Sequence, residues 1–304
     1  MPNPIDFIAD LTDPELRFLG YALLLALLSA VVCGVLGTFV VLRGMAFIGD
    51  ATAHAVFPGL ALAFVLQGSL LLSGAASGVA AAAIIALLTV RNRVKPDTLI
   101  GILLVTAFAS GIMIITFAPG YAGALQQVLF GSFGSSTAAD VLVTAVVTLL
   151  LLTVVLVFKR GFVLVALDKE LARTAGLRVL LLDVVLYIAV AVAVVVAVKS
   201  MGNILVLALL LTPAATARLI TERLETMMLV APAMGVLAAV VGMYLSWGFN
   251  LPSGAAIVLV ATLIFGLCWL FAPRHGLLAG IRRRRDIVAA PTKTGTLRSA
   301  AAPR

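Results

Sequence analysis

The chain has 304 residues, of which 63% are hydrophobic and only 11% are charged, and its mean hydropathy is +1.21. This composition lies far outside that of soluble globular proteins. Several charge-free stretches reach the roughly 20 apolar residues that cross a bilayer. These runs are continuous rather than alternating, which excludes a transmembrane β-barrel. The sequence therefore predicts an all-α, polytopic membrane protein.

The basic residues indicate topology rather than a nucleic-acid ligand. The net charge is +8 and the pI is near 10.1, but Lys and Arg gather in short segments between apolar runs, as they do in cytoplasmic loops. When 91–95 is placed in the cytoplasm, the alternation of spans leaves only Arg17 and Lys199 outside. The lipid bilayer is therefore an expected partner and nucleic acid is not.

We expect eight or nine spans, and the nine-span assignment places the N-terminus outside and the C-terminus in the cytoplasm. The nine spans cover 18–42, 45–67, 70–90, 98–117, 138–158, 180–199, 203–220, 228–247 and 254–272. They form a transmembrane domain over 18–273. An extracytoplasmic segment, 1–17, precedes it, and its acidic residues argue against a cleaved signal peptide. A basic, disordered cytoplasmic tail, 274–304, follows.

The second span carries the one ionisable pair that the sequence places deep in an apolar span, Asp50 and His54. No other acid, base or histidine lies between Gly44 and Val90. Ionisable groups at membrane depth are costly and mark function, and i,i+4 spacing places both side chains on one helix face. Counted from Gly44, Asp50 lies roughly 9 Å and His54 roughly 15 Å from the inner end of the span.

A carboxylate next to an imidazole can hold a divalent transition metal. Asp50 and His54 cannot complete a coordination shell, so other helices or water must finish any site. The alternative is a buried Asp–His pair with a purely structural role. By residue type alone, both interpretations remain open.

Prolines are expected to interrupt two spans. Pro58-Gly59 lies in the second span and Pro213 in the seventh. Proline frees a backbone carbonyl and bends a helix, and broken spans often mark transport sites. A simple packing kink is the alternative. Segment 118–137 is too rich in glycine for a full span, and fits an external loop or a short re-entrant segment.

The longest polar interruption, 159–178, contains a predicted short helix. Asp168 is its expected N-cap and Gly176 its expected stop. Leu171, Ala172 and Ala175 lie between them, and the small residues would let another protein approach closely. An ordinary amphipathic connector is the alternative.

Together these segments resemble the permease subunits of ATP-binding cassette (ABC) importers for manganese, zinc and iron. The resemblance covers about 18–273 and rests on the order of several motifs. These motifs lie at 43–59, 129–132, 138–140, 168–176, 201–205, 211–218 and 251–256. Asn203 departs from the usual pattern of the family and adds an amide near the expected outer mouth.

The resemblance implies an ABC importer permease fold that works as a homodimer on two cytoplasmic ATPase subunits. A metal-binding lipoprotein would supply Mn²⁺, Zn²⁺ or Fe²⁺ from outside, and no cofactor would be bound permanently. Asp50 and His54 correspond to residues that meet the metal in transit. The 168–176 helix corresponds to the coupling helix that docks on the ATPase. ATP hydrolysis would reside in the partner, so the chain itself would not be an enzyme.

Two other functions would fit parts of this pattern. An intramembrane metalloprotease built around His54 would need at least three protein ligands and a general base. The chain has only two histidines and no His-Glu-x-x-His motif, which argues against it. A sister importer of siderophores or cobalamin would share the helical fold but needs no Asp–His pair.

The remaining polar residues have structural explanations. Asp183 is expected at the membrane interface near the inner end of the sixth span, and Asp140 is expected to cap the fifth. Cys33 and Cys268 both lie inside predicted spans and form no metal-binding or disulfide pattern.

Overall fold

The computed structural model describes residues 4–13, 16–91, 96–116 and 136–272. Across these ranges the secondary structure is helical, without strands. The helices are α1 Pro4–Thr12, α2 Arg17–Leu42, α3 Ile48–Val65, α4 Leu70–Arg91, α5 Pro96–Ile115, α7 Ala138–Leu167, α8 Lys169–Thr174, α9 Val179–Met201, α10 Asn203–Ile220, α11 Leu224–Phe249 and α12 Ser253–Phe271. The all-α prediction is confirmed.

The helices match the predicted spans. Seven helices in the described ranges are long and apolar enough to cross a membrane, and α4 and α5 contain shorter apolar stretches. Large apolar side chains on the outer faces of α7 and α12 are exposed, including Leu149 at 69% and Leu259 at 69%. Such faces suit contact with lipid chains. The chain is an integral membrane protein.

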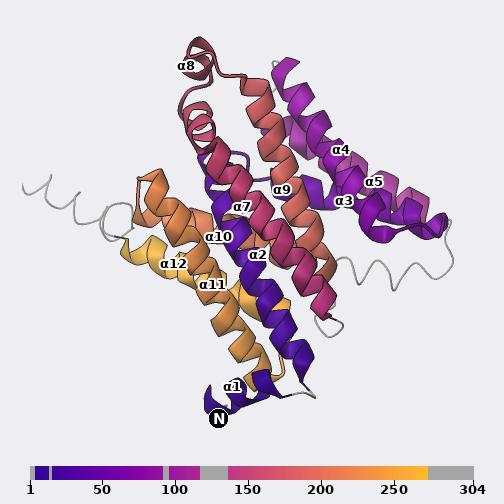
Figure 1. The fold of residues 1–304 in the computed structure, drawn as a ribbon, viewed down its shortest axis with the longest axis vertical. Helices are drawn as coiled ribbons and strands as arrows, with labels where there is room; N and C mark the ends of the chain where they lie inside the picture. The colour runs from indigo at the N-terminus through magenta and orange to yellow at the C-terminus, as the bar shows by residue number, and fades with distance from the viewer. Residues whose placement is uncertain (1–3, 14–15, 92–95, 117–135, 273–304) are drawn as a thin grey trace, which may run out of the picture.

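Two features near the ends of the molecule were not predicted. Helix α1 forms within the N-terminal segment and is held to α11 by Trp247, whose Nε1 donates to Asp10 Oδ2 at 2.9 Å. Helix α7 continues past the expected end of its span at 158 to Leu167, because Lys and Arg are good helix formers. Its 30 residues extend about 45 Å. Helices α1 and α8 lie at opposite ends of the long axis (Figure 1).

The expected helix breaks are not found. Helix α3 runs continuously through Pro58 and Gly59, and α10 runs continuously through Pro213. A proline removes only one hydrogen bond of the helix, and packed neighbours can hold the helix together. A Cβ on Gly59 would collide with the Ser73 carbonyl and the Ser77 hydroxyl of α4. Gly59 therefore serves close packing between α3 and α4.

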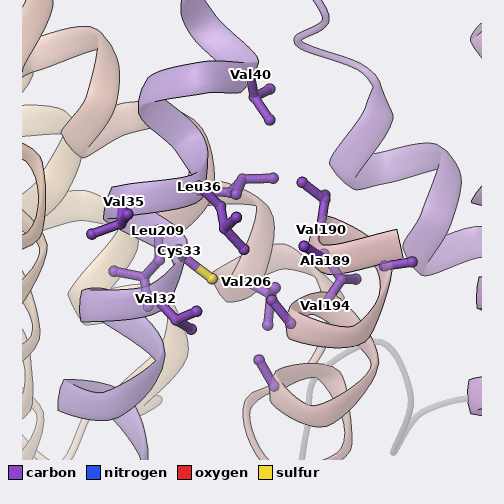
Figure 2. Close-up of a cluster of buried hydrophobic side chains, with 14 of the residues drawn as sticks. Val32, Cys33, Val35, Leu36, Val40, Ala189, Val190, Val194, Val206 and Leu209 are labelled. Atoms are coloured by element: carbon purple, nitrogen blue, oxygen red, sulfur yellow. The ribbon is translucent and has the colours of Figure 1, made fainter. Parts of the chain in front are cut away.

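The core forms where α2, α9 and α10 meet. Figure 2 shows Cys33 and Leu36 of α2 together with Val190 of α9 and Val206 of α10. Backbones also approach closely along α2. A Cβ on Gly34 would lie 2.7 Å from the Pro232 nitrogen of α11.

A second close approach along α2 lies one turn further on. A Cβ on Gly37 would overlap the Leu210 carbonyl of α10. Helices α2, α10 and α11 are therefore in direct backbone contact, whereas α3, α4 and α5 pack together as a neighbouring group.

Three predicted segments fall largely outside the described residues. They are the 91–95 loop, the segment at 118–137 and the tail at 274–304.

Candidate metal site

The chain enters α3 through a tight connection that fixes Asp50 near the start of this helix. Helix α2 ends at Leu42, and Gly44 adopts a φ of 64°, which favours glycine. Helix α3 begins at Ile48 rather than at 45, because the chain turns at 43–44 and again at 46–47. Asp50 therefore lies in the first helical turn, closer to the helix start than predicted.

Asp50 and His54 meet as the i,i+4 spacing predicts. The His54 Nδ1 atom lies 3.2 Å from Asp50 Oδ1 and 3.0 Å from the Asp50 carbonyl oxygen. The side chain of Asp50 is 25% exposed and that of His54 is 19% exposed, so the pair is largely but not fully enclosed. Because both neighbouring Asp50 atoms are acceptors, Nδ1 carries the proton. This arrangement leaves the Nε2 lone pair available to a metal ion.

Asn203 joins the pair from α10. Its Nδ2 atom lies 3.3 Å from His54 Nδ1, and its Oδ1 atom is buried without a partner in the described residues. Because Nδ1 carries the proton, only the amide oxygen can accept a hydrogen bond from it, and a flip of the amide brings Oδ1 to that position. No role was predicted for Asn203, because 149 residues separate it from His54. The one signal in the sequence was that Asn203 departs from the usual pattern of the resembled family.

An aromatic wall closes another side of the site. The Phe108 ring of α5 stands edge-on to the His54 ring, with centroids 5.0 Å apart. Phe57, one turn along α3, packs against the same Phe108 ring at 5.8 Å. The imidazole is therefore held between an amide on α10 and an apolar ring on α5.

The ligand set is small. In the described part of the chain, no group of three or more His, Cys, Asp and Glu side chains could hold a metal. Asp50 offers one anionic oxygen donor and His54 one nitrogen donor. Such a site suits passing contact with an ion that keeps exchangeable waters, and a closed structural site would need more protein ligands.

The predicted helix breaks differ in their relation to this pair. Pro58 lies one turn after His54 and cannot donate a hydrogen bond to the His54 carbonyl. Pro213 lies ten residues beyond Asn203 on α10, roughly 15 Å along the helix. The structure therefore brings Pro58 near the pair and leaves Pro213 away from it.

The short helix α8 has the predicted cap and stop. Asp168 Oδ1 accepts hydrogen bonds from the backbone nitrogens of Glu170 at 2.8 Å and Leu171 at 3.2 Å. Gly176 has a φ of 79°. The expected contact surface needs a correction, because Ala172 is fully buried against the rest of the chain.

The accessible surface of α8 consists of other residues. Leu171 is 55% exposed, and Ala175 is also exposed. Ala172 thus holds α8 in place, while Leu171 and Ala175 are open to a partner.

Two further acidic residues occupy defined positions. Asp140 forms a capping box with Thr137 at the start of α7, which confirms its predicted role. The expectation for Asp183 was incomplete, because its side chain is only 3% exposed. It bonds Arg43 at 2.6 Å and Lys169 at 3.0 Å. The two basic partners come from distant segments, and pairing with them offsets the cost of burying this carboxylate.

Comparison with known protein families assigns this helical architecture to one of them. The family model described as the ABC 3 transport family matches residues 15–272, nearly all of the helical region. The chain belongs to the ABC 3 transport family. It is therefore a transporter permease, as the sequence motifs indicated.

Individual members of the ABC 3 transport family agree with this assignment. The chain is 40% identical over 271 residues to the manganese transport system membrane protein MntC of Listeria innocua, covering 89% of this chain and 96% of the relative. It is 31% identical to a probable iron transport system membrane protein of Haemophilus influenzae, covering 84% and 91%.

A solved structure also resembles the whole molecule. PsaBC from Streptococcus pneumoniae, solved in complex with a Fab, superimposes with a TM-score of 0.79 and 33% identity. The match covers 90% of this chain and 98% of that one. The permease fold predicted from the sequence is confirmed.

Proposed function

We propose that this chain is the membrane-spanning subunit of an ABC importer for a divalent transition metal, with Mn²⁺ as the first candidate. The observation that carries the proposal is the Asp50–His54 pair, whose Nδ1 is held by Asp50 and whose Nε2 has no hydrogen-bond partner among the described residues. Relatives named for manganese support Mn²⁺, and the more distant iron-transport relative keeps Fe²⁺ in the set. Zn²⁺ accepts the same donors.

The chain would work within a larger assembly. A second copy of the permease would complete the metal path, a metal-binding lipoprotein would deliver the ion from outside, and cytoplasmic ATPase subunits would supply energy. The α8 helix would dock on the ATPase through Leu171 and Ala175, which are accessible in this chain. ATP hydrolysis would take place in that partner, and the metal would be cargo rather than a permanent cofactor.

The chemistry at the pair is exchange of ligands around a moving ion. Asp50 compensates charge and offers a hard oxygen, while His54 offers a borderline nitrogen that Ca²⁺ and Mg²⁺ favour less. Asn203 steadies the imidazole on one side and Phe108 on the other. Because only a few protein ligands hold the ion, the ion can also leave the site, and transport requires release as much as binding.

Uptake by the reconstituted complex tests the proposal. The permease and its ATPase in liposomes, with the lipoprotein outside, should accumulate radioactive Mn²⁺ only when ATP is present inside the vesicles with the ATPase. Excess Zn²⁺ should inhibit this uptake, because nitrogen and oxygen sites bind Zn²⁺ more tightly than Mn²⁺. Transport of intact ferric siderophores, without transport of free Mn²⁺, would favour the chelate importer instead.

The proposed orientation places α1 outside and α8 in the cytoplasm, and cysteine labelling tests it. In a background without Cys33 and Cys268, Ile8→Cys on α1 should react with an impermeant thiol reagent in intact cells, since Ile8 is 63% exposed. Thr174→Cys on exposed α8, and a cysteine added after position 285, should be protected until the membrane is opened. Protection at both ends would require an even number of spans. Labelling of Thr174→Cys in intact cells would invert the orientation.

A further inference from the structure

One buried cluster of charges connects α8 with the connection that leads into α3. We define the Asp183 cluster as Asp183 on α9, Arg43 directly after α2, and Lys169 at the start of α8. Arg43 Nη1 lies 2.6 Å from Asp183 Oδ1, and Lys169 Nζ lies 3.0 Å from Asp183 Oδ2. One carboxylate thus holds two cations from segments far apart in the sequence.

Each member is tied firmly to its own element. Lys169 is the first residue of α8 and follows the cap Asp168, so its backbone moves with that helix. Arg43 directly follows the last residue of α2, and its backbone nitrogen donates a hydrogen bond to the Phe39 carbonyl at 3.1 Å. The Tyr187 hydroxyl, one turn beyond Asp183, lies 3.1 Å from Met45 Sδ. The connection between α2 and α3 is therefore anchored to α9 at two points.

The Asp183 cluster differs from the other ion pairs of the described chain. Lys159–Glu225 and Arg173–Glu170 are largely solvated, with Glu225 80% and Glu170 77% exposed. Exposed pairs of this kind contribute little. In the Asp183 cluster, the Arg43 and Asp183 side chains are only 4% and 3% exposed, and Lys169, 41% exposed, reaches the buried carboxylate from the surface. Burial makes their mutual position costly to change.

The Asp183 cluster also contains more positive charge than is needed to neutralise the Asp183 carboxylate. Arg43 alone would balance Asp183, yet Lys169 reaches the second oxygen from α8. Arg43 itself is not fully paired, because its buried Nε and Nη2 atoms have no partner in the described residues. Its guanidinium therefore has donors free for a second arrangement, which a fixed structural bridge would have used.

We propose that the Asp183 cluster is the link through which movement of α8 reaches the α2–α3 connection and, seven residues beyond Arg43, Asp50. This inference rests on the proposed function, in which α8 docks on the ATPase. When α8 shifts, Lys169 pulls on or releases Asp183, and the Arg43 guanidinium follows the carboxylate. Because Arg43 and Met45 lead directly into α3, the start of α3 then moves with its metal-binding pair.

Lys169 is the best residue for testing the link. Its side chain is 41% exposed, so its replacement should not unfold the protein. The experiment uses the reconstituted complex and measures Mn²⁺ imported per ATP hydrolysed. Co-purification of the ATPase and Mn²⁺ binding to the permease are measured alongside. Lys169→Gln removes the link, Lys169→Arg restores a cation, and Lys159→Gln removes a comparable lysine–carboxylate pair outside the cluster.

We expect Lys169→Gln to lower Mn²⁺ import per ATP by about two- to thirty-fold, the range of coupling effects along such networks. Assembly and Mn²⁺ binding should stay normal, Lys169→Arg should restore most of the ratio, and Lys159→Gln should match the wild type. In a double-mutant cycle, Lys169→Gln should have no further effect once Asp183→Asn is present.

An unchanged ratio in Lys169→Gln would overturn the link. Loss of the ATPase or of Mn²⁺ binding in that variant would also overturn it, because Lys169 would then serve docking or folding. These results are separable from failure of the proposed function. If the wild-type complex imports no metal, the function is wrong, whereas wild-type import with an unaltered Lys169→Gln ratio refutes the link alone.

Discussion

Replacing Asp50 or His54 with alanine is expected to abolish metal uptake while the protein still inserts into the membrane. Each change removes half of the donor pair described above. Mutation of a residue that only orients a metal ligand already lowers metal affinity or activity by about 10–100-fold. We therefore expect uptake to fall more than about 100-fold in either variant. Removing an ionisable group from a span should ease insertion, so expression at the wild-type level is part of the prediction.

A graded series separates the metal pair from general damage to α3. Asn203→Ala should reduce uptake by about 10–100-fold, because Asn203 positions the imidazole without replacing a primary donor. Thr52→Val is the matched control, since within the described residues the Thr52 hydroxyl bonds only to the carbonyls of its own helix at Ile48 and Gly49. Its uptake should be close to normal. Wild-type uptake in Asp50→Ala at equal expression would remove the pair from the metal path.

Replacing Leu171 with aspartate is expected to separate the permease from its ATPase. Leu171 is the large apolar side chain that α8 exposes, at 55%, and burying a leucine side chain is worth about 2 kcal/mol. That loss corresponds to about thirty-fold weaker binding. Affinity purification of the permease should then recover little ATPase. Ala175→Trp, on the same exposed side of α8, should act in the same direction.

The comparison with Leu171→Met distinguishes a docking surface from a fold defect. Methionine keeps the apolar surface of α8, so this variant should retain the ATPase. If Leu171→Asp co-purifies with a full complement of ATPase and still transports metal, then α8 is an ordinary connector. Ala172→Trp addresses a different property, because Ala172 is buried and a bulky side chain there would dislodge α8 itself.

Features that depend on near neighbours in the sequence were predictable. The helical spans follow from uninterrupted apolar runs, and the Asp50–His54 contact follows from i,i+4 spacing on any helix. The cap at Asp168 and the glycine stop at Gly176 likewise depend on a few adjacent residues. These features need no knowledge of how the helices pack.

Features that depend on packing between distant segments could not be predicted. Asn203 meets His54 across 149 positions, and Asp183 meets Arg43 across 140. The prolines were expected to break α3 and α10, but neighbouring helices hold both intact. The inward orientation of Ala172 arises in the same way, since a six-residue helix does not show which side will pack.

The close backbone contacts of α2 also determine where the molecule can change shape. With Gly34 against Pro232 and Gly37 against the Leu210 carbonyl, no flexible side chain separates α2 from α10 and α11. We therefore expect these three helices to move together as one body. Opening and closing during a transport cycle are then expected along the seam between this body and the group formed by α3, α4 and α5. His54 and Asn203 face each other across that seam, so any rigid-body displacement would remodel the cargo's surroundings directly.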